Sequence, residues 1–338
     1  MKSSLDNNYR ASQWPLPPRQ ETATGDPRRV GVELEFSGMD IESIAGIMLS
    51  ELGGEAEVIS PYEQILRDSS LGTFGLELDY GYLKQLGRER NIEEDSDLEQ
   101  FGEALLKLVA EQLVPHEIVS PPIAMGDLWQ LGDLLQRLRQ AGAKGTRHAA
   151  VYAFGLHLNP ELPDLEAPTI LAYMRSFLCL YEWLVEREQV DLSRRITPYI
   201  DPFPRKYVTR VLDADYSPDL PLLIDDYLKF NATRNRALDM LPLFSHLDAP
   251  RVRAAVDDDR VNPRPTLHYR LPNCQVDEGN WSLASPWRNW LQVEALASDE
   301  RRLALACRAY RQHLDSPAGG LFRDWPEGVS RWLLPELL

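Results

Sequence analysis

The pentapeptide Val32-Glu33-Leu34-Glu35-Phe36 holds the residues whose types and spacing point most directly to chemistry. Side chains alternate between the two faces of a strand, so both glutamates would share one face and the apolar residues the other. Two neighbouring carboxylates repel each other unless solvent or a cation lies over them, and magnesium prefers carboxylate oxygens. The segment therefore indicates either a metal-binding sheet face or a half-exposed strand whose glutamates point into water.

Three later segments, residues 75–80, 154–159 and 267–271, alternate in the same way. Their polar positions are Glu77 and Asp79, His157 and Asn159, and His268 and Arg270. An ordinary solvated sheet face would more often carry Thr, Ser, Lys and Gln, so this set of acids, imidazoles and a guanidinium is typical of a site lining. Two simpler interpretations stay open: the histidines could be hydrogen-bonded residues of a sheet, and Arg270 could pair with a glutamate in the absence of a metal.

Composition limits the possible classes of protein. The chain has 338 residues, of which 43% are hydrophobic and 26% charged, and a formal net charge of −16, as expected of one or two globular domains. The negative charge argues against a nucleic acid or an anionic membrane as partner. Cys179, Cys274 and Cys307 are too far apart in sequence for a zinc knuckle or a disulfide framework, which favours a reducing, cytoplasmic setting. We expect no leader peptide and no membrane span.

The elements that must hold the polar pairs alternate between strand and helix. We expect an arm over residues 1–28, then a single domain over 29–338 with helical insertions at about 167–260. The expected strands and helices follow the hydrophobic pattern: strands at 29–36, 55–68, 117–120, 154–159 and 266–271, and helices at 40–52, 101–113, 128–138, 167–189 and through most of 198–248. This order predicts an α+β fold with a largely antiparallel sheet and a helical C-terminal half. Neither a Rossmann nor a P-loop glycine motif is present.

Six short segments, in this order, resemble the amidoligases of the glutamine synthetase and glutamate–cysteine ligase superfamily. They are residues 31–36 (Gly-Val-Glu-Leu-Glu-Phe), 66–71 (Leu-Arg-Asp-Ser-Ser-Leu), 117–122 (Glu-Ile-Val-Ser-Pro-Pro), 155–159 (Gly-Leu-His-Leu-Asn), 231–236 (Asn-Ala-Thr-Arg-Asn-Arg) and 269–270 (Tyr-Arg). The resemblance implies a curved, mostly antiparallel catalytic sheet on which acidic side chains hold Mg²⁺. It also implies a reaction that uses ATP to join a carboxylate to an amine through an acyl phosphate.

The resemblance assigns roles to individual residues. The expected metal ligands are Glu33, Glu35 and Glu117. Nucleotide contacts are expected from His157, Asn159, Arg236 and His268. The expected catalytic groups are Asp68, which would place or deprotonate the amine, and Arg234 and Arg270, which would stabilise the transferred phosphoryl group. Asp68 could instead cap a turn beside its serines.

Two residues depart from the family pattern. Asn159 stands where a second histidine is expected, and His268 stands where an acid is expected. An amide is a weaker metal ligand than a carboxylate, and an imidazole changes the local charge. The leading hypothesis is a ligase acting on small-molecule or peptide carboxylates and amines, for which a homo-oligomer is a further expectation. One alternative is a relative that has lost catalysis and binds a peptide or protein partner, and another is a metal-dependent hydrolase that works without ATP.

Overall fold

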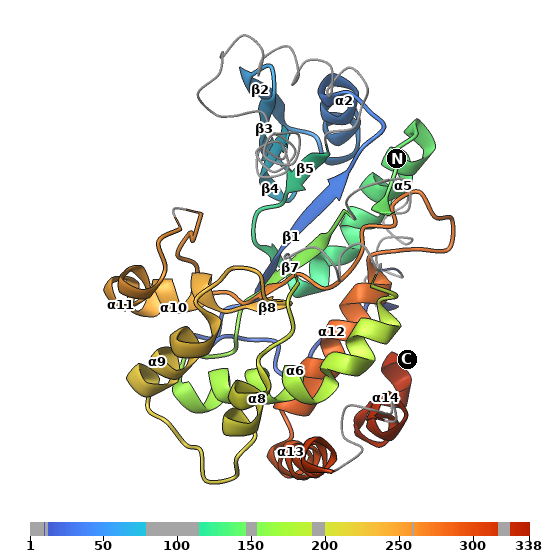
Figure 1. The fold of residues 1–338 in the computed structure, drawn as a ribbon. Helices are drawn as coiled ribbons and strands as arrows, with labels where there is room; N and C mark the ends of the chain where they lie inside the picture. The colour runs from blue at the N-terminus through green and yellow to red at the C-terminus, as the bar shows by residue number, and fades with distance from the viewer. Residues whose placement is uncertain are drawn as a thin grey trace, which may run out of the picture.

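An antiparallel sheet runs through the computed structural model, which describes residues 10, 13–78, 115–146, 154–190, 200–258, 260–316 and 325–338. Its strand order is β2-β3-β4-β5-β1-β7-β9-β8, and β6 pairs with the start of β1 (Figure 1). The strands are β1 (Arg29–Phe36), β2 (Glu55–Ser60), β3 (Glu63–Ser69), β4 (Gly72–Leu78), β5 (His116–Val119), β6 (Ile123–Ala124), β7 (Leu156–Pro160), β8 (Leu238–Asp239) and β9 (His268–Tyr269).

The register of β1 with its two neighbours decides which polar residues meet. Glu35 lies opposite Glu117 of β5, and Glu33 lies opposite His157 of β7. Because opposite residues in an antiparallel pair share a face, these four side chains lie on one side of the sheet. The central position of β1 thus brings together residues that are 82 and 124 positions apart in the sequence.

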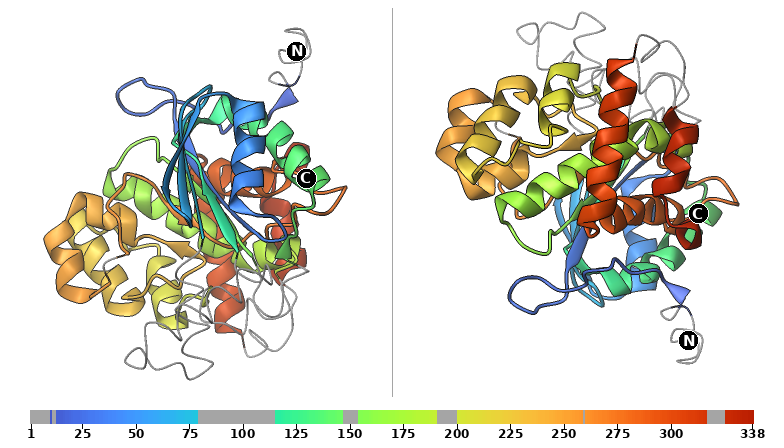
Figure 2. Two further views of the ribbon diagram at one scale, coloured as in Figure 1. Left: turned by 90° about the horizontal axis from the view of Figure 1, so that it is seen from above. Right: turned by 90° about the horizontal axis from the view of Figure 1, so that it is seen from below.

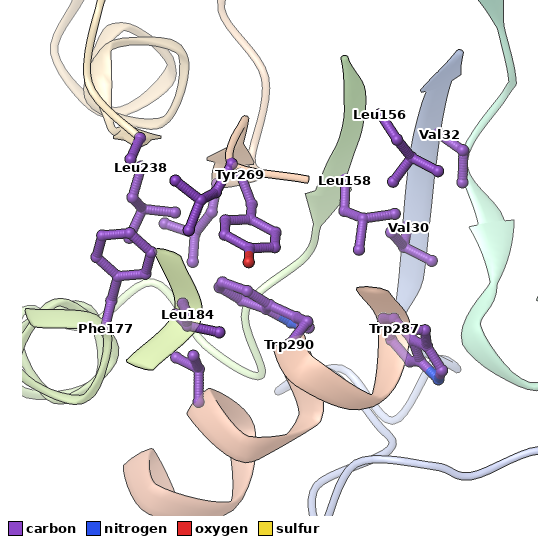
Figure 3. Close-up of a cluster of buried hydrophobic side chains, with 14 of the residues drawn as sticks. Val30, Val32, Leu156, Leu158, Phe177, Leu184, Leu238, Tyr269, Trp287 and Trp290 are labelled. Atoms are coloured by element: carbon purple, nitrogen blue, oxygen red, sulfur yellow. The ribbon is translucent and has the colours of Figure 1, made fainter. Parts of the chain in front are cut away.

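The other face of the sheet is apolar and is covered by helices. Leu158 and Tyr269 lie opposite each other on β7 and β9, and Tyr269 packs against Phe177 and Trp290 of two long helices (Figure 3). These helices are α6 (Ala167–Arg187) and α12 (Ala284–Ala297), while α2 (Ile41–Leu52) and α5 (Leu131–Ala141) lie beside the other end of the sheet. Burial of this apolar surface is the main force that fixes the polar face opposite.

A group of short helices lies at the β8 edge of the sheet (Figure 2). It consists of α8 (Arg205–Val211), α9 (Leu220–Asn231), α10 (Leu241–Leu247) and α11 (Ala249–Ala255). The chain ends with α13 (Glu300–Asp315) and α14 (Trp325–Val329), and the 3₁₀ turns are η1 (Met125–Gln130), η3 (Ser330–Trp332) and η4 (Pro335–Leu337). No helix in the described ranges is both long and apolar enough to cross a membrane.

The sequence-based prediction of an α+β fold with a mostly antiparallel sheet is confirmed. The strand predicted at 29–36 and the long helix predicted from 167 both form within a few residues of their expected bounds. The segment 198–248 is not helical throughout, because it also contains β8. The helix expected at 101–113 and the side chain of Asp79 lie outside the described residues.

The described part of the N-terminal arm is anchored against the helical layer. Trp287 of α12 donates its indole N–H to the carbonyl oxygen of Pro15 at 2.8 Å. Arg28, at the end of the arm, is fully buried and pairs with Glu294 of α12 at 2.7 Å. The arm therefore packs against α12 and leads directly into β1.

Candidate active site

Glu33 lies at the centre of the polar face, and both of its carboxylate oxygens have partners. Its Oε1 accepts hydrogen bonds from Asn159 Nδ2 at 2.8 Å and from a guanidinium nitrogen of Arg264 at 3.2 Å. Its Oε2 lies 3.0 Å from His157 Nδ1. Because Glu33 is only 8% exposed, these three neighbours, rather than water, stabilise its charge.

The two residues that depart from the family pattern are in direct contact. Asn159 Oδ1 lies 2.5 Å from His268 Nδ1, so His268 donates this hydrogen bond while the amide nitrogen of Asn159 donates to Glu33. The rings of His157 and His268 also meet edge to face, with centroids 5.1 Å apart. Asn159 therefore links Glu33 to His268 through its two ends.

Burial sets the ionisation of this group. Burial, assisted by the nearby cation Arg270, holds the pKa of His268 well below its ordinary value, so this imidazole is neutral at neutral pH. Burial alone would raise the pKa of Glu33, but the surrounding groups outweigh it and hold the pKa well below its usual range. Since His268 is neutral, we attribute the anionic state of Glu33 to the hydrogen bond from His157 and to Arg264.

A second group, next to the first, consists of Glu35, Glu117 and His157. Glu35 Oε2 accepts the backbone N–H of Gly155 at 2.6 Å, and its Oε1 lies 3.6 Å from His157 Nε2. One ligand atom from each of the three residues lies within 4.8 Å of the other two. Glu33, His157 and His268 meet the same criterion, so His157 belongs to both groups.

The hydrogen bond to Glu33 determines how His157 can act. A nitrogen 3.0 Å from an ionised carboxylate must carry the proton, so Nδ1 is the donor in the neutral ring and Nε2 retains its lone pair. Nε2 lies 3.6 Å from Glu35 Oε1, which is beyond hydrogen-bonding distance. A histidine that donates one N–H to a carboxylate and directs the other nitrogen at further carboxylates has the arrangement of a metal ligand.

An acidic row extends this second group across the sheet. Glu63 of β3 lies opposite Glu77 of β4, Glu77 lies opposite Glu117, and Glu117 lies opposite Glu35. Like charges placed directly opposite each other on neighbouring strands destabilise a sheet. Two carboxylates and an imidazole nitrogen at one end of such a row fit a divalent cation such as Mg²⁺ or Mn²⁺.

Arginines surround a buried acid at the β8 edge. Asp239 lies opposite His268, and its Oδ2 is 4.0 Å from Arg234 Nε. Arg270 donates to the backbone carbonyl of Arg234 at 3.3 Å, and its positive charge acts on the Arg234 guanidinium. Burial raises the pKa of Asp239 to about 6, although the nearby arginines oppose this shift. Burial and Arg270 lower the pKa of Arg234.

Two of the predicted residues lie apart from this cluster. Arg236 is buried among Asn231, Pro202 and Phe203, where it donates to an amide oxygen and a carbonyl oxygen and lies over an aromatic ring. Asp68 is an exposed residue of β3 with a φ of 51°, and β4 and β5 separate its strand from β1. The structure thus brings together eight of the ten predicted site residues, on β1, β5, β7 and β9, directly after β9, and in the segment before β8.

Sequence reasoning missed Arg264 and Asp239. Arg264 lies between Pro263 and Pro265 just before β9, and an arginine in such a loop gives no periodic signal. Asp239 belongs to a strand of two residues, which is too short for alternation to be recognised. The only local hint was the arginine-rich segment that precedes Asp239.

The fold and the site together define an α+β protein with acids, imidazoles and guanidinium groups gathered on one face of an antiparallel sheet. A family model described as "Putative amidoligase enzyme" matches residues 26–292, and the chain belongs to this family. The matched region contains every strand of the described residues and all the residues of the cluster. No curated protein and no solved structure shows significant similarity to the chain.

Proposed function

We propose that the protein is an ATP-dependent carboxylate–amine ligase with a glutamine synthetase-like catalytic sheet, and that ATP and Mg²⁺ are its cofactors. The observation that carries the proposal is the convergence of His157 with Glu35 and Glu117, in a chain of the amidoligase family. Phosphoryl transfer from ATP to a carboxylate requires neutralisation of phosphate charge above all. The same face of the sheet carries both the anionic ligands for a cation and the arginines for phosphate oxygens.

Each residue of the cluster has a distinct part in this proposal. Glu35, Glu117 and His157 would hold the divalent cation, which when bound neutralises phosphate charge and polarises the transferred group. Glu33 fixes the tautomer and the orientation of His157. Arg234 and Arg270 would bind the phosphoryl oxygens, because guanidinium groups form paired hydrogen bonds with them. A neutral amine would then attack the carbonyl carbon of the acyl phosphate, form the amide as the C–O bond to phosphate breaks, and release inorganic phosphate and a proton. The assignments of Asp68 and Arg236 remain predictions from the resemblance.

The test is ADP release from ATP and Mg²⁺ with a panel of amino acids, polyamines and peptides. We expect at least one acid and amine pair to raise ADP release and to yield an amide detectable by mass spectrometry. Glu35→Gln should lower this rate on the order of a hundredfold, because it removes a ligand that supports transition-state charge. Glu57→Gln is the matched control, since Glu57 is exposed on β2 and pairs with Arg67.

Other outcomes would favour the other classes of function. Thermal stabilisation by ATP and Mg²⁺ together, without ADP release for any pair, would contradict the ligase and favour a binding protein. Cleavage of amide substrates in the absence of ATP would favour a hydrolase. A Glu35→Gln variant as active as wild type would exclude the proposed cation site.

A further inference from the structure

Two groups of residues in the cluster could each receive a cation, but one of them already contains a positive side chain. We propose that Arg264 is a built-in cation in the place of a second metal ion, so that the chain binds a single divalent cation at Glu35, Glu117 and His157. This inference rests on the proposed function for the first cation site. It concerns the group formed by Glu33, His157 and His268, which would otherwise be the second site.

The first argument is that protein donors already occupy Glu33. Arg264 and Asn159 donate to one carboxylate oxygen, and the protonated Nδ1 of His157 donates to the other. A cation bound here would have to displace at least one of these donors. An ion that used His157 Nδ1 would also need the ring to lose its hydrogen bond to Glu33.

The second argument is charge. A guanidinium group is a cation, and that of Arg264 lies 3.2 Å from Glu33 Oε1. The negative charge of Glu33 and the positive charge of this guanidinium cancel, and Asn159 adds no charge. A divalent cation among these residues would lie next to a fixed positive charge, and repulsion would oppose its binding.

The third argument is that His268 is engaged elsewhere. Its Nδ1 hydrogen-bonds to Asn159 Oδ1 at 2.5 Å, so an ion could use this nitrogen only after that bond breaks. The same amide then donates to Glu33. The two departures from the family pattern thus form, with Arg264, one hydrogen-bonded group that satisfies Glu33 without an ion.

The loop before β9 holds Arg264 in this place. Pro263 and Pro265 restrict the backbone on both sides, and the N–H of Arg264 donates to the carbonyl oxygen of Pro242 at 3.1 Å. The side chain is 33% exposed, so it is not sealed from solvent. A guanidinium has five N–H donors, which lets Arg264 bind Glu33 and a phosphate oxygen together.

The experiment counts Mn²⁺ ions bound to the full chain, without nucleotide, by electron paramagnetic resonance and isothermal titration calorimetry. We expect one ion for wild type and two for Arg264→Ala. Arg260→Ala is the matched control: Arg260 lies in the same loop, is 69% exposed and pairs with Asp258, so this variant should still bind one ion. The double variant Arg264→Ala/His268→Gln should return to one ion, which locates the added site.

Several results would overturn the inference. Two ions on wild type would contradict it while leaving the proposed ligase in place. One ion on an Arg264→Ala variant that melts as cooperatively as wild type would show that Arg264 does not exclude a second cation. Binding of no Mn²⁺ by wild type would refute both this inference and the cation site of the proposed function. If the first site is formed by Glu35, Glu117 and His157, then Glu35→Gln should lose the bound Mn²⁺ and Glu57→Gln should keep it.

Discussion

At the scale of single residues, the site depends on side chains that serve two neighbours at once. Asn159 can do this because an amide carries a donor and an acceptor at fixed positions, and these reach Glu33 and His268 respectively. His157 does the same with its two ring nitrogens, one toward Glu33 and the other toward Glu35. An aspartate at position 159 would lose the donor and place a second carboxylate beside Glu33.

Asp239 gives a prediction about pH. Its pKa is raised from 3.8 to about 6 by burial, so the folded state binds its proton more tightly than the unfolded chain. A group that is protonated more readily in the folded state makes the folded protein less stable as the pH rises through this interval. Asp239→Asn mimics the protonated acid and does not titrate. We therefore expect its free energy of unfolding, relative to that of wild type, to rise by about 1 kcal/mol between about pH 5 and 7.5. Urea denaturation at both pH values measures this difference.

A control separates this effect from a general change in charge. Asp225 of α9 is exposed and pairs with Arg251, so Asp225→Asn removes a charge that solvent already screens. Its free energy of unfolding relative to wild type should change little between the two pH values. If Asp239→Asn behaved in the same way as Asp225→Asn, then burial of Asp239 would not raise its pKa in the folded protein.

At the scale of elements, the sequence predicted those features that are local. Alternation across 29–36 and 155–159 predicted which side chains share a face, because each segment is long enough to show the period of a strand. The neighbours of each strand could not be read in this way, since pairing is set by contacts between distant segments. The sequence therefore predicted the polar positions on β1 and β7, while the register that places Glu33 opposite His157 came only from the fold.

The turn between α2 and β2 provides the prediction at this scale. Gly53 and Gly54 both have positive φ, at 70° and 91°. A Cβ on Gly54 would lie 2.2 Å from the carbonyl oxygen of Arg67, whereas a Cβ on Gly53 would have nothing within 4 Å. We expect Gly53→Ala to lower the free energy of unfolding by about 1–3 kcal/mol, because side chains rarely adopt its φ of 70° with a ψ of −162°. Gly54→Ala should cost clearly more, because β3 must move as well.

These two variants form a matched pair. Both add one methyl group to a left-handed glycine at the same helix end, so the difference in their free energies of unfolding reports the contact with β3. Urea denaturation of both variants measures this difference. Equal destabilisation would mean that the backbone of β3 moves away at no cost and that the α2–β2 turn is not packed tightly against it.

At the scale of the whole molecule, one buried ion pair joins segments far apart in the chain. Glu294 of α12 accepts two hydrogen bonds from Arg28, at 2.7 and 3.0 Å, and further ones from Tyr173 of α6 and from Trp290. Arg28 also donates to backbone carbonyls of Arg19 and Glu161. Since Arg28 leads into β1, this group fixes the central strand to both long helices on the apolar side, opposite the site.

Because this pair is buried, we expect its disruption to lower the free energy of unfolding more than the disruption of a surface pair. Both side chains are 0% exposed, so Glu294→Gln would leave a buried guanidinium without its counter-charge, at a cost of about 3–5 kcal/mol. Asp164→Asn, which breaks the exposed pair with Arg19, should cost at most about 1 kcal/mol. The double variant Arg28→Met/Glu294→Leu should be more stable than Glu294→Gln alone, because no buried charge remains unpaired. Chemical denaturation of the three variants measures these costs. A Glu294→Gln variant no less stable than Asp164→Asn would show that the Arg28 guanidinium is solvated in the folded protein.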